Sequence, residues 1–218
     1  PGHTQIPIWP TGKMPDALPH TKPEYLNTRT TEILNVSQPT MTVYSPKIKN
    51  TGTAVIVFPG GGFNGLAIDL EGTEICHWLT SRGITCVLLK YRVPDSGPAW
   101  HQSCHCNIHP KAPTALEDAQ RTLGLVRLNA SKWHINPNKI GVIGFSSGGY
   151  MVADISTHFT KRAYKPIDSA DKESCRPDFA IALYPGHMQK RNEQFVLNPN
   201  IHFTKNTPPT FLLQAEND

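Results

Sequence analysis

The chain has 218 residues, of which 38% are apolar, and this size and composition are typical of one globular domain with a sizeable core. Its 21 basic and 17 acidic residues leave a net charge of +4 with no block of like charges, which excludes a nucleic-acid-binding arm and an acidic tail. The uninterrupted apolar runs are only a few residues long, which excludes a membrane span.

The first quarter of the chain predicts an extended segment followed by three strands. Residues 1–29 are rich in proline and lack an apolar period, so we expect them to run along a surface. Residues 31–36 and 40–44 alternate and are rich in β-branched side chains, which predicts two antiparallel edge strands. Residues 53–58 are continuously apolar, which is typical of a strand buried on both faces of a parallel sheet.

Helical and strand patterns alternate along the rest of the chain. They predict a helix that ends at Gly83, a strand at 84–90, a helix around 116–126, a strand at 139–145, a helix at 146–159 and strands at 179–184 and 210–214. We expect the irregular residues 92–113 to insert a loop beside the functional site. The alternation predicts a three-layer α/β fold with a mainly parallel sheet, formed by residues 1–218 as one domain.

The pentapeptide Gly144-Phe145-Ser146-Ser147-Gly148 matches the pattern G-x-S-x-G, between a predicted strand and a predicted helix. This pattern places a nucleophilic serine on a sharp turn, where small residues two places before and after it avoid a backbone clash. A frame shifted by one residue would need glycine where Phe145 stands. Ser146 is therefore favoured over Ser147 as the nucleophile.

A second glycine-rich segment, Pro-Gly-Gly-Gly-Phe at residues 59–63, follows the first buried strand. Glycines allow the backbone to approach a substrate and to turn its N–H groups toward it. A P-loop is excluded because no Gly-Lys-Ser/Thr follows, and the G-x-G-x-x-G spacing that begins at Gly60 leaves a dinucleotide-binding turn as an alternative. Together with the serine turn, the segment predicts an oxyanion hole formed by the N–H groups of Gly61, Gly62 and Ser147.

With these motifs the chain resembles an α/β-hydrolase and, more narrowly, the bacterial esterases grouped with acetyl-xylan and related carbohydrate esterases. The matching stretches are residues 8–10, 53–63, 88–94, 116–121 and 138–149. Pro59 stands where the relatives of hormone-sensitive lipase have histidine, which favours the Pro-Gly-Gly-Gly esterases. The resemblance implies hydrolysis of short acyl esters without a cofactor.

The resemblance also implies a catalytic triad in the order Ser, then Asp or Glu, then His. Residues 209–218 predict a buried strand that runs into acidic side chains, so Asp218 is the expected triad acid and Glu216 a weaker candidate; a solvated chain end is the alternative. None of the 10 histidines matches the family's base position. We therefore expect a C-terminally truncated fragment that lacks the last strand, the closing helix and the catalytic histidine.

Five potential metal ligands lie close together in the predicted loop, at His101, Cys104, His105, Cys106 and His109. Metal binding and a disulfide within the loop are both open alternatives, and a lid or a loop that contacts substrate is favoured over either. We expect Trp100, His101, Phe63 and His187 to lie near the substrate, and we expect no metal in the catalytic site.

The remaining cysteines and the start of the chain bear on the cellular compartment. The five cysteines form neither a dense disulfide framework nor a zinc-ribbon spacing, and Cys76 and Cys86 are predicted to be small buried hydrophobic residues. The chain starts at Pro1 without a leader, which suggests a processed or trimmed chain. The compartment stays open, with a lean toward secretion or the periplasm.

The motifs and the resemblance together predict a serine carboxylesterase that hydrolyses short-chain esters, with acetylated carbohydrates such as acetyl-xylan as expected substrates. A peptidase or thioesterase on the same scaffold is one alternative, because a fold does not fix a substrate. A binding module that kept the pocket and lost the triad is another. Neither a nucleic acid nor a membrane is an expected partner, and the oligomeric state is not predicted.

Overall fold

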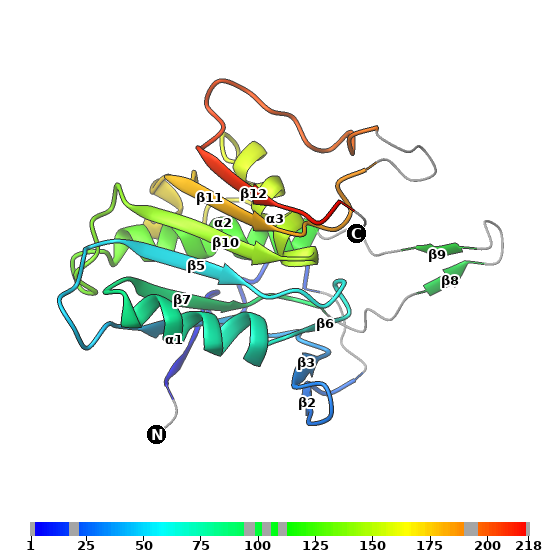
Figure 1. The fold of residues 1–218 in the computed structure, drawn as a ribbon, viewed down its shortest axis with the longest axis horizontal. Coiled ribbons are helices and arrows are strands. Elements are labelled where there is room, and N and C mark those ends of the chain that lie inside the picture. The colour runs from blue at the N-terminus through cyan, green and yellow to red at the C-terminus, as the bar shows by residue number, and fades with distance from the viewer. Residues whose placement is uncertain are drawn as a thin grey trace.

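The computed structural model describes residues 3–17, 22–93, 99–101, 106–108, 113–189 and 196–216, with the backbone alone at 99–101, 106–108 and 113. Its main sheet has seven strands in the order β1-β4-β7-β5-β10-β11-β12. Figure 1 shows five of them in this order, from β7 through β5, β10 and β11 to β12. These strands are β1 (Gln5–Pro7), β4 (Thr40–Tyr44), β5 (Ala54–Phe58), β7 (Thr85–Lys90), β10 (Ile140–Phe145), β11 (Phe179–Leu183) and β12 (Thr210–Leu213). The last five pair in parallel, and β4 is antiparallel to β1 and β7, so the predicted mainly parallel sheet is confirmed.

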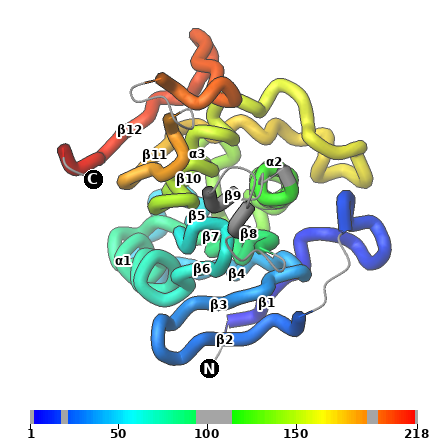
Figure 2. Tube along the Cα trace, turned by 90° about the vertical axis from the view of Figure 1, so that its right-hand side faces the viewer, coloured from blue at the N-terminus to red at the C-terminus, as the bar shows by residue number. Residues whose placement is uncertain are grey.

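Helices cover both faces of the sheet, which gives the three predicted layers (Figure 2). They are α1 (Glu74–Ser81), α2 (Pro113–Leu128) and α3 (Ser147–Thr157), with a π-helical turn at Asp69–Thr73 and a 3-10 turn at Ser169–Lys172. Alternate residues of β5 serve the two faces: Ile56 and Phe58 pack with α2 and α3, whereas Val55 and Val57 pack with α1. Burial on both sides explains why β5, β7 and β10 have no polar face.

Two smaller sheets lie beside the main one. One contains β2 (Tyr25–Asn27), β3 (Glu32–Leu34) and β6 (Gly65–Leu66), and the other is a hairpin of β8 (Ala99–His101) and β9 (Cys106–Ile108). The prediction that residues 31–36 and 40–44 form antiparallel strands is confirmed, but their predicted edge position is wrong, because each has a neighbour on both sides. The first stretch forms β3 of a small sheet, and the second forms β4, which β1 covers at the edge. Whether a strand lies at the edge of a sheet depends on which strands pair with it. The alternation of side chains along one strand does not encode its partners.

The proline-rich N-terminal segment enters the core at Trp9, which is 7% exposed. Its indole Nε1 donates a hydrogen bond of 2.7 Å to Asp118 Oδ1 on α2. The guanidinium groups of Arg92 and Arg121 lie 5.8 and 5.5 Å from the centre of the indole ring. The segment thus contributes a buried anchor as well as surface chain.

Arg92, directly beyond β7, is buried against the same acidic side chain. Its backbone N–H and its Nε donate to Asp118, and its Nη2 lies 2.8 Å from Glu117 Oε2. Removing one partner of such a buried pair leaves an uncompensated charge, which is strongly destabilising. These contacts fix α2 against the end of β7.

Within the described residues, β12 is the last strand of the sheet and is exposed, which differs from the prediction of a buried strand. Phe211, Leu212 and Leu213 are 60%, 60% and 53% exposed. They pair with β11 on one side only within the described residues. Apolar composition predicted the strand correctly, but burial depends on what neighbouring elements cover.

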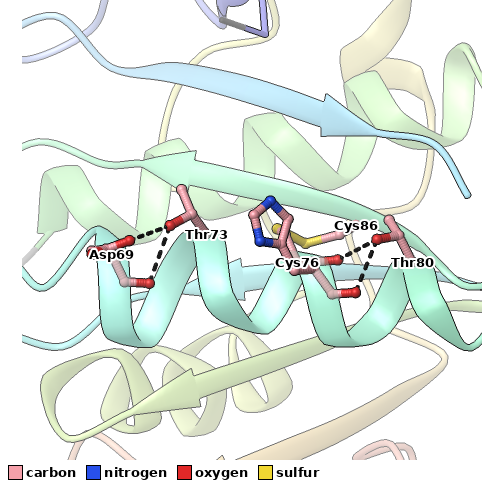
Figure 3. The surroundings of a disulfide bond; sticks show 6 residues. Asp69, Thr73, Cys76, Thr80 and Cys86 are labelled. Atoms are coloured by element: carbon pink, nitrogen blue, oxygen red, sulfur yellow. Dashed lines mark hydrogen bonds between the residues drawn. A yellow bond between two sulfur atoms is a disulfide. The ribbon is translucent and has the colours of Figure 1, made fainter. Parts of the chain in front are cut away.

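Cys76 and Cys86 are buried as predicted, but the structure joins them in a disulfide with a Cα–Cα distance of 5.2 Å (Figure 3). The bond links α1 to β7, whose side chains at these positions face each other across one layer boundary. The pairing was not predicted from the sequence. The two cysteines are 10 residues apart, on a helix and on a strand, and only the packing of these elements brings them together.

We expect replacement of both cysteines by alanine to lower the free energy of unfolding by about 2–3 kcal/mol, because the bond restricts a loop of the unfolded chain. Urea unfolding measures the loss, and mass spectrometry of a non-reduced digest detects the linked peptides in the parent protein. Separate Cys76 and Cys86 peptides in that digest would contradict the pairing.

Candidate active site

The candidate site lies at the carboxyl edge of the parallel strands, where β5, β10 and β11 end next to one another. The loop after β5, the turn after β10 and the turn after β11 meet there, and Figure 1 shows the hairpin β8–β9 projecting from the same side. Ligands of open α/β sheets bind at this edge, because the connections that leave neighbouring strands gather there.

Ser146 occupies the turn between β10 and α3 in a strained backbone conformation, with φ 51° and ψ −116°. Its N–H donates to the Leu183 carbonyl at 3.1 Å, and its own carbonyl accepts from the N–H groups of Tyr150 and Gly186. The residue is partly exposed, and its Oγ has no hydrogen-bond partner among the described residues. Hydrogen bonds thus fix the backbone of Ser146 on both sides, while its hydroxyl stays available to a ligand.

Glycines make this turn possible because neighbouring backbone lies too close for any side chain. A Cβ added to Gly144 would lie 2.1 Å from the Gly148 carbonyl oxygen, and one added to Gly148 would lie 2.0 Å from the Phe58 carbonyl oxygen. The second contact joins the turn to the end of β5. The two glycines of the G-x-S-x-G pattern are therefore required by packing as well as by the turn.

The loop after β5 presents free backbone donors beside this turn. Gly61 and Gly62 have φ values of 131° and 62°, which glycine adopts without strain. Within the described part of the chain, the N–H groups of Gly61, Gly62 and Ser147 donate to no protein acceptor. The loop itself is closed by the Gly61 carbonyl, which accepts from Asn64 and Gly65.

Aromatic rings pack beneath the loop. Phe63 is 5% exposed, and its ring centre lies 6.2 Å from those of Tyr91 and Tyr150 and 5.7 Å from that of His187. The Tyr91 hydroxyl donates to the Pro59 carbonyl at 2.6 Å, and burial raises the pKa of Tyr91. Phe63 is thus buried and His187 is partly exposed, and the expectation that both lie near the substrate stays a prediction.

Sequence reasoning missed one acidic residue at the site, Glu71. Its Oε2 accepts a 2.7 Å hydrogen bond from the Gly60 N–H, and its Oε1 accepts a 3.0 Å bond from the Tyr184 hydroxyl. Burial and the nearby Glu71 carboxylate raise the pKa of Tyr184 to about 12. A glutamate 11 residues beyond a glycine carries no recognised motif, so no local signal identified it.

Several predicted residues fall outside this description. Asp218, Cys104, His105 and His109 lie outside the described residues, as do the side chains of Trp100, His101 and Cys106. Among the residues described, no group of three or more His, Cys, Asp or Glu side chains could hold a metal ion. The expectations for the triad acid and for the loop residues therefore stay predictions.

His158, a possible base by type, lies at the far end of α3. Its Nδ1 is 2.9 Å from Asp154 Oδ1, and the hydrogen bond to that carboxylate raises the pKa of His158. A helical rise of about 1.5 Å per residue places it about 18 Å from Ser146. His158 therefore lies far from the serine turn in this structure.

We expect Gly148→Ala to destabilise the protein by about 3 kcal/mol or more, because the new methyl group meets a backbone carbonyl that has no rotamer to change. Thermal unfolding of the two proteins measures the loss. Gly186→Ala is the matched control, since its Cβ would lie 3.8 Å or more from its neighbours. Equal melting temperatures for both variants and the parent would contradict the close approach.

No helix in the described ranges is long and apolar enough to cross a membrane.

Comparison with solved structures places the chain among α/β hydrolases. The acetyl ester-xyloside bifunctional hydrolase of Caldicellulosiruptor lactoaceticus superimposes with a TM-score of 0.69 and 30% identity, over 97% of this chain and 74% of that one. An α/β hydrolase from a Medee basin deep-sea metagenome library shares the fold, with a TM-score of 0.59 and 23% identity over 97% of this chain and 67% of that one.

The sequence comparisons agree with the structural ones. The acetylxylan esterase of Xylanibacter ruminicola is 31% identical over 135 residues, which cover 62% of this chain and 23% of that protein. The endo-1,4-beta-xylanase B of Butyrivibrio fibrisolvens is 28% identical over 75% of this chain and 27% of its own length. The chain thus spans about a quarter of the length of these curated relatives.

The family model BD-FAE matches residues 41–183, a range that runs from β4 through β11 and contains Gly61, Gly62 and Ser146. The predicted α/β-hydrolase fold and the resemblance to esterases are confirmed by these comparisons. The chain belongs to the BD-FAE family of α/β-hydrolase esterases.

Proposed function

We propose that the protein is a serine carboxylesterase that hydrolyses short-chain acyl esters of carbohydrates. The observation that carries this proposal is the strained Ser146 turn, whose open hydroxyl lies beside backbone N–H groups that have no acceptor among the described residues. A nucleophile next to such donors is the arrangement that acyl transfer requires, because negative charge develops on the carbonyl oxygen as the nucleophile attacks.

In the proposed reaction, Ser146 Oγ attacks the acyl carbonyl and loses its proton to a histidine base. The N–H groups of Gly61, Gly62 and Ser147 stabilise the oxyanion of the tetrahedral intermediate. The intermediate then collapses: the bond to the sugar oxygen breaks, this oxygen takes the proton from the histidine and departs as a hydroxyl, and the remaining acyl-serine is hydrolysed by water. Asp218 orients the histidine, which in the superfamily order follows the acid along the chain. The reaction needs no cofactor.

The names of the relatives support the choice of substrate. One curated relative is an acetylxylan esterase, and one structural relative with 30% identity is an acetyl ester-xyloside bifunctional hydrolase. Both names combine an ester with xylose chemistry. We therefore propose acetylated xylan and acetylated xylo-oligosaccharides as the substrates of this protein.

We expect a fluorophosphonate probe to label the full-length protein at Ser146, because an activated serine attacks phosphorus as it attacks a carbonyl. Ser146→Ala should abolish labelling, while Ser156→Ala, a buried serine further along α3, should retain it. Tandem mass spectrometry locates the adduct. A parent protein without label at Ser146 would support a binding module and overturn the enzyme.

Substrate preference separates the esterase from its competitors. We expect kcat/KM for 4-nitrophenyl acetate to exceed that for the octanoate ester, and acetate release from acetylated xylan to exceed cleavage of peptide amides or acyl thioesters. Faster cleavage of amides or thioesters would reject the carbohydrate-esterase proposal in favour of a peptidase or thioesterase.

We expect Asp218→Asn to lower kcat by about 10⁴-fold in the full-length protein, because an amide in place of the carboxylate leaves the histidine in the wrong tautomer. Glu216→Gln is the matched control: Glu216 is exposed, and its loss should leave kcat within about threefold. Steady-state kinetics with an acetyl ester measure both. A large loss in Glu216→Gln and none in Asp218→Asn would assign the acid to Glu216.

A further inference from the structure

Glu71 links two loops that flank the serine turn. Its carboxylate accepts the Gly60 N–H on one oxygen and the Tyr184 hydroxyl on the other. Gly60 immediately precedes the donors Gly61 and Gly62, and Tyr184 opens the turn after β11. The two loops are far apart in the sequence, and this carboxylate joins them through hydrogen bonds, beside the ring contact between Phe63 and His187.

The carboxylate also lies close to the nucleophile's turn. A Cβ added to Gly60 would lie 2.6 Å from Glu71 Oε2 and 3.0 Å from the Ser146 Cβ, so both side chains border the same small space. On the other side, the Gly186 N–H of the β11 turn donates to the Ser146 carbonyl at 3.0 Å. A shift of the Glu71 carboxylate would therefore displace both loops that lie against Ser146.

The segment that carries Glu71 is itself held rigidly. It is a π-helical turn, in which the Thr73 N–H donates to the Ile68 carbonyl and the Thr73 hydroxyl donates to Asp69 Oδ1 at 2.6 Å (Figure 3). Gly72 packs within contact distance of Leu88, because a Cβ there would lie 3.1 Å from a Leu88 methyl carbon. Isolated π-helical turns are rare and frequently occur at functional sites.

The disulfide strengthens this attachment. Cys76 lies in the first turn of α1, directly after the π-helical turn, and is bonded to Cys86 of β7 (Figure 3). Helix, strand and turn thus form one unit below the glycine loop. A carboxylate on such a unit holds its hydrogen-bond partners at a defined place, as preorganised sites require.

We propose that Glu71 is a positioning residue that sets the place of the Gly61 and Gly62 N–H groups relative to Ser146. It contacts no reacting atom and acts through Gly60 and Tyr184. This inference rests on the proposed esterase function for its kinetic consequence, whereas the structural consequence, a loop held by the carboxylate, does not depend on activity. Donors that stabilise a transition state lose most of their effect when displaced by about 1 Å.

The kinetic test compares Glu71→Ala, Glu71→Gln and Tyr184→Phe in the full-length protein with 4-nitrophenyl acetate as the substrate. We expect Glu71→Ala to lower kcat by about 30-fold or more and to change KM by less than about threefold, because the affected donors act mainly in the transition state. Glutamine keeps one oxygen acceptor for the Gly60 N–H, so Glu71→Gln should retain kcat within about fivefold. Tyr184→Phe should fall between the two.

Glu74→Ala is the matched control, since Glu74 lies three residues further on, is exposed and forms no part of the site. Its kcat should equal that of the parent. Thermal unfolding of all four variants identifies any that fail to fold, and Glu71→Gln and Tyr184→Phe preserve side-chain volume. A kcat in folded Glu71→Ala within threefold of the parent would overturn the inference.

Hydrogen–deuterium exchange provides a readout that needs no activity. Peptides that cover residues 59–67 should exchange at least about 10-fold faster in Glu71→Ala than in Glu71→Gln, while peptides of β7 and β10 should not change. Unchanged exchange at 59–67 would overturn the positioning role. If the parent protein neither labels nor hydrolyses esters, the proposed function fails, and the exchange result still decides the role of Glu71.

Discussion

The contact between the serine turn and the end of β5 is the constraint on which the candidate site depends. Gly148 approaches the Phe58 carbonyl so closely that an added Cβ would lie 2.0 Å from it. The contact fixes the start of α3 against the first parallel strand and holds Ser146 at φ 51°. Because β5 continues directly into the glycine loop, the same contact brings the open hydroxyl and the free N–H groups together.

The rest of the fold supplies the rigidity that this strained turn needs. A residue in such a conformation costs about 1–3 kcal/mol and persists only when its surroundings determine it. Here β5 and β10 are neighbours buried on both faces, with α1 on one side and α2 and α3 on the other. The buried group of Trp9, Arg92 and Asp118 adds the N-terminal segment to this framework. Glu71 extends it to the two flanking loops.

The order of strands and helices and the position of Ser146 were predictable because each depends on a short stretch of chain. Continuous apolar runs indicated the buried strands, and the spacing of Gly144, Ser146 and Gly148 indicated the turn. Features that depend on two distant segments were not predictable in this way. The Cys76–Cys86 pairing and the contacts of Glu71 arise where separate elements meet, and the exposure of β12 depends on which elements cover it.

By itself, the sequence determined the fold class, the nucleophile's turn and the glycine loop, because backbone sterics and hydrophobic periodicity act over a few residues. The tertiary structure decided which groups surround them. It buried the ring of Phe63 and brought a carboxylate from a π-helical turn to the Gly60 N–H at the start of the glycine loop. The physical reason is that burial and hydrogen-bond partners are properties of the packed chain, set by elements that only the fold brings into contact.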